Sequence, residues 1–247
     1  MQSTTVWDGD TVFGRYQVVD CWYDGRPARV LYSGDRQAAQ SGVATDGKPE
    51  LLFDYNQRFM ELALAQRPRT VAIIGGGTGT FATALLAALP EVRVDMVEPN
   101  ANLTDLGYEF FDLPVDERLQ IFHTDGRTFL REHAARYDLV VVDAFSHTTM
   151  PKDLATAAAA RAYRRHLTVH GLLAMNVISG YNGLGAVPLA QLGSLLGTVF
   201  EQVEVFVARR GYSLWLPQNF VVIAHAGNDD IAPADYLHTD VVSMPAM

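Results

Sequence analysis

The sequence has a single cysteine, Cys21, among its 247 residues, and it carries little positive charge. One cysteine excludes an internal disulfide and a multi-cysteine metal cluster, so we expect a reducing, cytoplasmic compartment and no bound metal. Lysine and arginine number 19 against 28 aspartates and glutamates, which gives a formal net charge of -9. Because phosphate backbones are bound by clustered cations, this balance argues against nucleic acid as a partner.

Long hydrophobic runs are also missing. A membrane-spanning helix needs roughly 20 consecutive apolar residues, and the sequence contains no such run. The opening stretch MQSTTVWDGD lacks the basic and apolar regions of a secretory leader. We therefore expect neither export nor membrane insertion. Hydrophobic residues still make up 49% of the chain, enough for one large core with a small appendage.

The first part of the chain is rich in strand-forming residues. From Tyr16 to about Gln37, two short β-type pieces are separated by turn signals, which predicts a small hairpin layer. The polar stretch from Gln40 to Pro49 predicts a loop. Helical spacing of apolar residues then predicts a helix over about 55–66.

The middle of the chain alternates apolar strands with helices. Buried strands are predicted at about 70–75, 92–99, 119–125, 137–144 and 171–178, with helices at about 81–90, 128–134 and 155–167. This order is typical of an α/β doubly wound sheet. Two further strands, at 203–210 and 219–226, suit an antiparallel hairpin at the edge of the sheet. The prediction is a β-rich segment over 1–54, a Rossmann-like nucleoside-binding domain over 55–228 and a tail over 229–247.

A glycine-rich turn follows the first buried strand. Gly75, Gly77 and Gly79 stand where the strand ends and a helix begins, with Gly76 and Thr78 between them. Such a turn brings a ligand close to the backbone, with helix N-terminal amides facing it, although a tight turn of purely structural origin has the same composition. The next strand ends in Glu98, about twenty residues on, where a carboxylate can accept hydrogen bonds from two ribose hydroxyls.

Two more aspartates end strands in the same way. Asp125, followed by Gly126, can accept from an adenine amino group, or can simply close an Asx turn. Asp143 ends the strand at 137–144 and is a candidate catalytic base, or a cap for the turn that follows. Since the carboxyl ends of parallel strands form the ligand-binding edge of open α/β sheets, we expect these side chains to gather at one rim.

Taken in order, the segments SGDRQ, DYNQ, IIGGGTGT, MVEPN, TDGRTFL and YDLVVVDAF resemble the spermidine synthase family, the polyamine aminopropyltransferases. The resemblance runs from about Tyr16 to Ala226. It implies that Gln37 and residues 75–79 hold an S-adenosyl cofactor of the decarboxylated S-adenosylmethionine type, that Glu98 holds its ribose, and that Asp125 with Gly126 holds its adenine. It also implies catalysis by Asp143 and Tyr55, an amine acceptor, and a homo-oligomer.

The sequence departs from the family pattern at two acidic positions, which are Thr78 and Ser146 here. A neutral residue 78 would tolerate the carboxylate of intact S-adenosylmethionine. Three functions therefore stay open: aminopropyl transfer, methyl transfer from S-adenosylmethionine, and binding of a nucleoside without catalysis.

Overall fold

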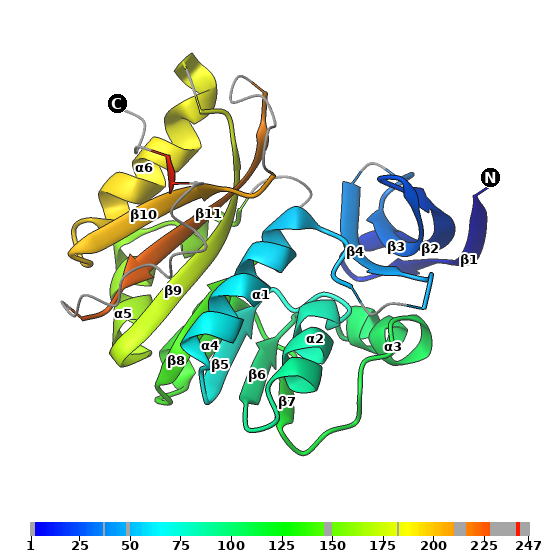
Figure 1. Ribbon diagram of the computed structural model, residues 1–247, viewed down its shortest axis with the longest axis horizontal. Helices are drawn as coiled ribbons and strands as arrows, with labels where there is room; N and C mark the ends of the chain where they lie inside the picture. Colours follow the sequence, from blue (N-terminus) through cyan, green and yellow to red (C-terminus); the bar gives the residue numbers. More distant parts are fainter. Residues whose placement is uncertain are drawn as a thin grey trace.

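The computed structural model contains two β-sheets. The structure describes residues 3–36, 38–47, 50–145, 150–181, 183–209, 216–227 and 241–242. The smaller sheet is antiparallel in the order β1-β2-β3-β4. Its strands are β1 (Thr4–Thr11), β2 (Gly14–Tyr23), β3 (Arg26–Ser33) and β4 (Ala38–Ala44). This sheet forms one end of the molecule, drawn in blue in Figure 1.

The larger sheet has the order β12-β10-β11-β9-β8-β5-β6-β7. Its strands are β5 (Thr70–Ile74), β6 (Arg93–Val97), β7 (Leu119–Phe122), β8 (Tyr137–Val142), β9 (Leu167–Ser179), β10 (Gln202–Val207), β11 (Gln218–His225) and β12 (Val241–Val242). The strands from β7 to β9 are parallel, whereas β11 pairs antiparallel with β9 and β10. The predicted doubly wound sheet and its antiparallel hairpin are thus confirmed. The chain order reverses between β5 and β8, and such a switch point is where open sheets bind ligands.

Helices cover both faces of the larger sheet. They are α1 (Asp54–Gln66), α2 (Thr80–Ala88), α3 (Ala101–Phe110), α4 (Gly126–Glu132), α5 (Ala157–Arg165) and α6 (Val187–Leu196), with short 3-10 turns at Lys152–Leu154 and Gly183–Ala186. One hydrophobic core joins α1 and α2 to the sheet, and a second joins α4, α5 and α6 to its other face. In the part of the chain described here, no helix combines the length and apolar character of a membrane span.

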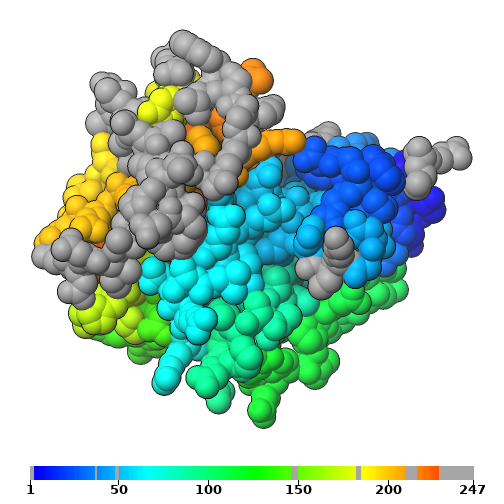
Figure 2. Space-filling view, in the orientation of Figure 1, coloured from blue at the N-terminus to red at the C-terminus, as the bar shows by residue number. Residues whose placement is uncertain are grey.

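A third, smaller core attaches the N-terminal sheet to α3, which follows β6 of the larger sheet. Val18 and Leu31 of the small sheet pack against Leu103 and Leu106 of α3. In the space-filling view the small sheet, in blue, lies directly against the cyan segment that includes α1 (Figure 2). The small sheet therefore forms a fixed wall beside the glycine-rich turn.

The structure corrects the expected loop from Gln40 to Pro49, because β4 occupies residues Ala38–Ala44. Small and polar residues have weak strand propensity, but here they pair with Ala28–Ser33 of β3. At Gly42 a Cβ atom would lie 2.6 Å from Cδ2 of Leu52, so a larger residue here would require the end of that flexible side chain to move. The structure also adds β1, α3, α6 and β12, none of which the sequence pattern predicted.

Candidate active site

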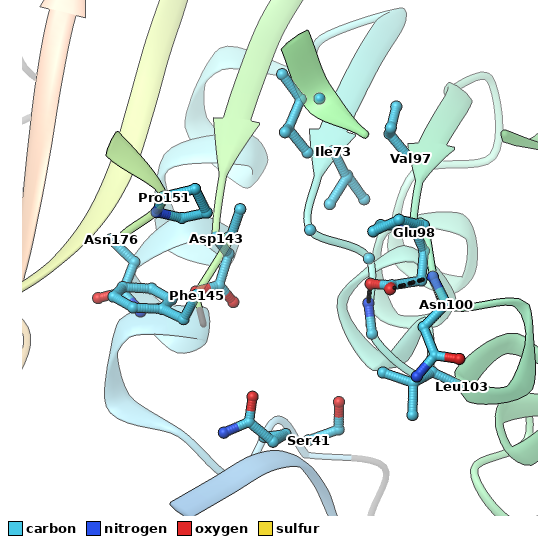
Figure 3. A pocket seen from close by; sticks show the side chains of 18 of the residues that line it. Ser41, Ile73, Val97, Glu98, Asn100, Leu103, Asp143, Phe145, Pro151 and Asn176 are labelled. Carbon is cyan, nitrogen blue, oxygen red and sulfur yellow. Dashed lines mark hydrogen bonds between the residues drawn. The ribbon is translucent and has the colours of Figure 1, made fainter. Parts of the chain in front are cut away.

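A cavity of about 790 Å³ opens at the carboxyl ends of the parallel strands. It lies at the switch point, with the glycine turn after β5 on one side and Asp143 after β8 on the other. Figure 3 shows Glu98 and Asn100 facing Asp143 and Asn176 across this space, with Ser41 of the small sheet at its rim. The predicted gathering of strand-end carboxylates is therefore observed: Glu98, Asp125 and Asp143 all line one cavity.

The glycine turn is shaped by close packing. At Gly75, where φ is +92°, a Cβ atom would lie 2.4 Å from the Asp143 carbonyl oxygen, so glycine lets the ends of β5 and β8 approach. At Gly77, where φ is +54°, a Cβ atom would lie 2.8 Å from Ser41 Oγ. Gly76 joins these two residues in the cavity wall.

The backbone amides of the glycine turn itself are hydrogen bonded within the protein, whereas the expectation that N-terminal amides of α2 face a ligand stays a prediction. The N–H groups of Gly75 and Gly76 both donate to Val97, and that of Gly79 donates to Gly76. The Gly77 amide donates to Glu98. All of these donors are satisfied inside the protein, so the turn offers a ligand close backbone approach rather than the amide cradle that phosphates require.

Glu98 is buried and holds the turn in place. Its Oε2 accepts from the Gly77 amide at 2.8 Å, and its Oε1 accepts from the Asn100 amide at 2.9 Å. Burial raises the pKa of this carboxyl, and the two amide hydrogen bonds oppose the rise. Each carboxylate oxygen has further acceptor capacity, and the residue lines the cavity, so Glu98 can still receive two ligand hydroxyls.

Asp143 is the most perturbed carboxyl in the cavity wall. It is partly exposed toward the cavity but lies deep in the protein, and this burial raises its pKa from 3.8 to about 6. Asn176 Nδ2 donates to Asp143 Oδ1 at 2.8 Å, and the Tyr55 hydroxyl is hydrogen bonded to the same carboxylate. Burial and the negative charge of Asp143 raise the pKa of Tyr55, which keeps its hydroxyl protonated as a donor. Sequence reasoning paired Asp143 with Tyr55, and the structure places them in contact.

Asp125 has the capping role that its sequence position suggested, and it also lies at the cavity. Its Oδ1 accepts from the Thr128 amide at 2.9 Å, which makes it the N-cap of α4 and lowers its pKa. The residue also lines the cavity together with Gly126, so capping positions the carboxylate at the rim. At Gly126 a Cβ atom would lie 2.5 Å from the Ile74 side chain, which explains the glycine by packing.

The side chain of Thr78 does not reach the cavity, where it was expected to face a cofactor. Its side chain is fully buried, and Thr78 and Gly79 lie outside the cavity wall. The Thr78 carbonyl packs so closely against α3 that a Cβ atom at Gly107 would lie 2.4 Å from it. Gly79 has φ of +79° and faces Leu113. The left-handed turn thus directs residue 78 into the protein, and its hydroxyl has no hydrogen-bond partner among the described residues.

The cavity wall also contains polar residues that sequence reasoning missed. Asn56 of α1, Asn176 of β9 and Asn219 of β11 all line it, and so does Ser41 of β4. Asparagines within apolar strand and helix patterns were the available signal. Gln37 and Ser146 lie outside the described residues. Within the described ranges, no group of three or more metal-ligating side chains is close enough to hold an ion.

Comparison with known proteins identifies clear relatives. A family model described as the spermine/spermidine synthase domain matches residues 53–179. A probable polyamine aminopropyl transferase of Bifidobacterium longum is 31% identical over 207 residues, which cover 84% of this chain and 45% of that protein. A polyamine aminopropyltransferase of Streptococcus uberis is 36% identical over 106 residues, which cover 39% of this chain and 37% of that one. The chain therefore matches less than half the length of either relative.

Solved structures share the fold at lower identity. A probable spermidine synthase from Corynebacterium glutamicum has a TM-score of 0.78 at 20% identity, covering 95% of this chain and 86% of that chain. A spermidine synthase in complex with the transition state analogue AdoDATO has a TM-score of 0.71 at 16% identity, covering 94% and 76%. Human methyltransferase-like protein 13, in complex with SAH, scores 0.57 at 20% identity and covers 75% and 84%. At these identities the likeness shows a common fold.

Proposed function

The chain belongs to the spermine/spermidine synthase family, and on that premise we propose that it transfers an aminopropyl group from decarboxylated S-adenosylmethionine to an amine. The observation that carries the proposal is the setting of Asp143. Its carboxylate stands at the switch point beside the glycine turn, is hydrogen bonded by Tyr55 and Asn176, and faces Glu98 across one cavity.

The nucleoside end of the cavity supports a ligand without phosphates. Amides in the glycine turn are used inside the protein, whereas Glu98 offers carboxylate oxygens suited to ribose hydroxyls. Asp125 stands at the same rim as an acceptor for an adenine amino group. An adenosine joined to a sulfonium fits this set of acceptors better than a dinucleotide, whose pyrophosphate needs free amide donors.

Asp143 would act as the general base. The bound cosubstrate supplies a sulfonium, which activates the neighbouring methylene carbon toward an amine nitrogen. As the new C–N bond forms and the C–S bond breaks, with methylthioadenosine leaving, Asp143 accepts the proton that the nitrogen loses. A pKa of about 6 makes this carboxylate a stronger base than an ordinary aspartate while it stays ionised at neutral pH. Tyr55 and Asn176 fix its orientation.

Thr78 no longer favours methyl transfer as the function. The neutral Thr78 suggested tolerance of the carboxylate in intact S-adenosylmethionine, but this side chain is buried away from the cavity. The fold itself is compatible with either donor, since a methyltransferase-like protein shares it.

The test is incubation of the protein with 1,4-diaminobutane and each donor, followed by mass spectrometry. We expect methylthioadenosine and an aminopropylated amine in equal amounts from the decarboxylated donor, and no methylated amine from intact S-adenosylmethionine. S-adenosylhomocysteine formation would support methyl transfer instead. Calorimetric binding of methylthioadenosine without turnover of any amine would favour the non-catalytic nucleoside binder.

A further inference from the structure

Three asparagines form a cluster beside Asp143. Asn176 lies on β9, and Asn219 lies on β11 directly opposite Ile178, so the two asparagines share one face of the sheet as diagonal neighbours. Asn56 reaches the same cavity from α1, the helix that packs on this side of β11. Residues far apart in the sequence thus place three amides on one wall.

The amide oxygens of this cluster lack hydrogen-bond partners. Oδ1 of Asn56, Asn176 and Asn219 is buried with no partner in the described part of the chain. Asn56 is 5% exposed and Asn176 is 2% exposed, whereas Asn219 is partly exposed. Buried polar atoms are nearly always paired, so these acceptors at a cavity wall are open to a donor group from water or from a ligand.

The three amides differ in their freedom to turn. Asn176 is fixed, because its Nδ2 donates to the Asp143 carboxylate, which only accepts hydrogen bonds when ionised. The Asn219 side chain makes no comparable hydrogen bond to another side chain among the described residues. A half-turn about its last side-chain bond exchanges oxygen and nitrogen without changing shape, and can present the oxygen to the cavity.

The wall formed by the three asparagines carries little negative charge for a site that would bind an amine. Of the four carboxylates that line the described cavity, Glu98 holds backbone amides on the opposite side and Asp125 caps α4. Asp153 forms an ion pair with Arg127, with 3.5 Å between Oδ2 and Nη1. Asp143 is thus the carboxylate that stands with the asparagines.

We infer that the side-chain amides of Asn219 and Asn56 form an uncharged binding site for the acceptor amine, which we call the amine seat. Their oxygens accept hydrogen bonds from the N–H groups of the amine without adding negative charge. The inference rests on the proposed function. An amine attacks only when unprotonated, and a second carboxylate within about 4–6 Å would favour the ammonium form, raising its pKa by about 1–3. Amide oxygens bind the same N–H groups with less of this penalty. Asn219 is thus a specificity-determining residue, and Asn176 is a positioning residue for Asp143.

The experiment replaces the neutral amide with a carboxylate of the same shape. Asn219→Asp is compared with wild type and with Asn102→Asp, which adds the same charge on an exposed site of α3 outside the cavity wall. Affinity for n-butylamine is measured by calorimetry with the protein saturated in methylthioadenosine, and aminopropyl transfer is measured from pH 6 to 10. Retained affinity for methylthioadenosine shows that each variant is folded.

We expect Asn219→Asp to bind the amine about tenfold more tightly at pH 7, to lose about tenfold in kcat there, and to shift its pH profile upward by about one unit. Asn102→Asp should match wild type. Unchanged amine affinity and pH profile in Asn219→Asp overturn the inference while leaving the proposed function intact. Conversely, tighter amine binding by the variant without turnover by wild type supports the amine seat and overturns the function. No amine binding by either protein, together with no aminopropyl transfer by wild type, overturns both.

Discussion

Replacing Asp143 with asparagine tests the central carboxylate through stability as well as activity. Burial raises the folded-state pKa of Asp143 from 3.8 to about 6, so the folded protein binds this proton more tightly than the unfolded chain. The stability that this preference contributes is fully present below about pH 3.8 and is lost as the pH rises through about 6. An amide cannot ionise, so Asp143→Asn avoids the loss.

The expected gain follows from the size of the pKa change. The span from 3.8 to about 6 corresponds to about 3 kcal/mol, at roughly 1.4 kcal/mol per pKa unit, which is the upper limit of the difference at pH 8. The substituted amide can still accept from Asn176 and donate to the Tyr55 oxygen, so few contacts are lost. Turnover should fall by about 100-fold or more, because the general base is gone.

Urea denaturation followed by circular dichroism, at intervals from pH 4 to 8, measures the difference. Asp143→Asn should match wild type near pH 4 and become more stable than wild type as the pH rises. Asp125→Asn is the control of opposite sign: the Thr128 amide lowers the pKa of Asp125, so this variant should be less stable than wild type at pH 7, and the gap should close toward acid. A difference between Asp143→Asn and wild type that does not change with pH would refute the reasoning.

Three further predictions follow from the cavity wall and the turn. Glu98→Gln should weaken methylthioadenosine binding by about 1.5–3 kcal/mol in calorimetry, because an NH2 group would face a backbone donor. Its control, Asp138→Ala, removes the carboxylate oxygen that accepts from the Arg69 and Thr70 amides at the other end of the sheet, so it should lower the melting temperature without changing affinity. Gly75→Ala should cost more than about 2 kcal/mol of stability in urea denaturation, since its Cβ would collide with the Asp143 carbonyl at positive φ. Thr78→Val should raise the free energy of unfolding by about 1 kcal/mol, because it removes an unpaired buried hydroxyl, and should leave methylthioadenosine affinity unchanged; weaker binding would return residue 78 to the site.

The central fold and the rim of the site follow from patterns within single segments of the sequence. Apolar runs of strand length alternate with helical patterns, and each strand of the parallel sheet is read from its own residues. Since parallel strands end at one edge, residues that follow them, such as Glu98 and Asp143, must gather there whatever the packing. The pairing of the glycine turn with Glu98 is likewise a local relation, carried by one strand-helix-strand unit.

Other features depend on contacts between segments that are distant in the sequence. β4 has small, polar residues whose strand form depends on pairing with β3, and Thr78 turns inward because a left-handed turn packs it under α3. The cluster of Asn56, Asn176 and Asn219 depends on the strand order β11-β9-β8 and on α1 lying over that face. Strand order and the direction of a side chain in a turn arise from contacts between distant segments, and no periodicity within one segment encodes them.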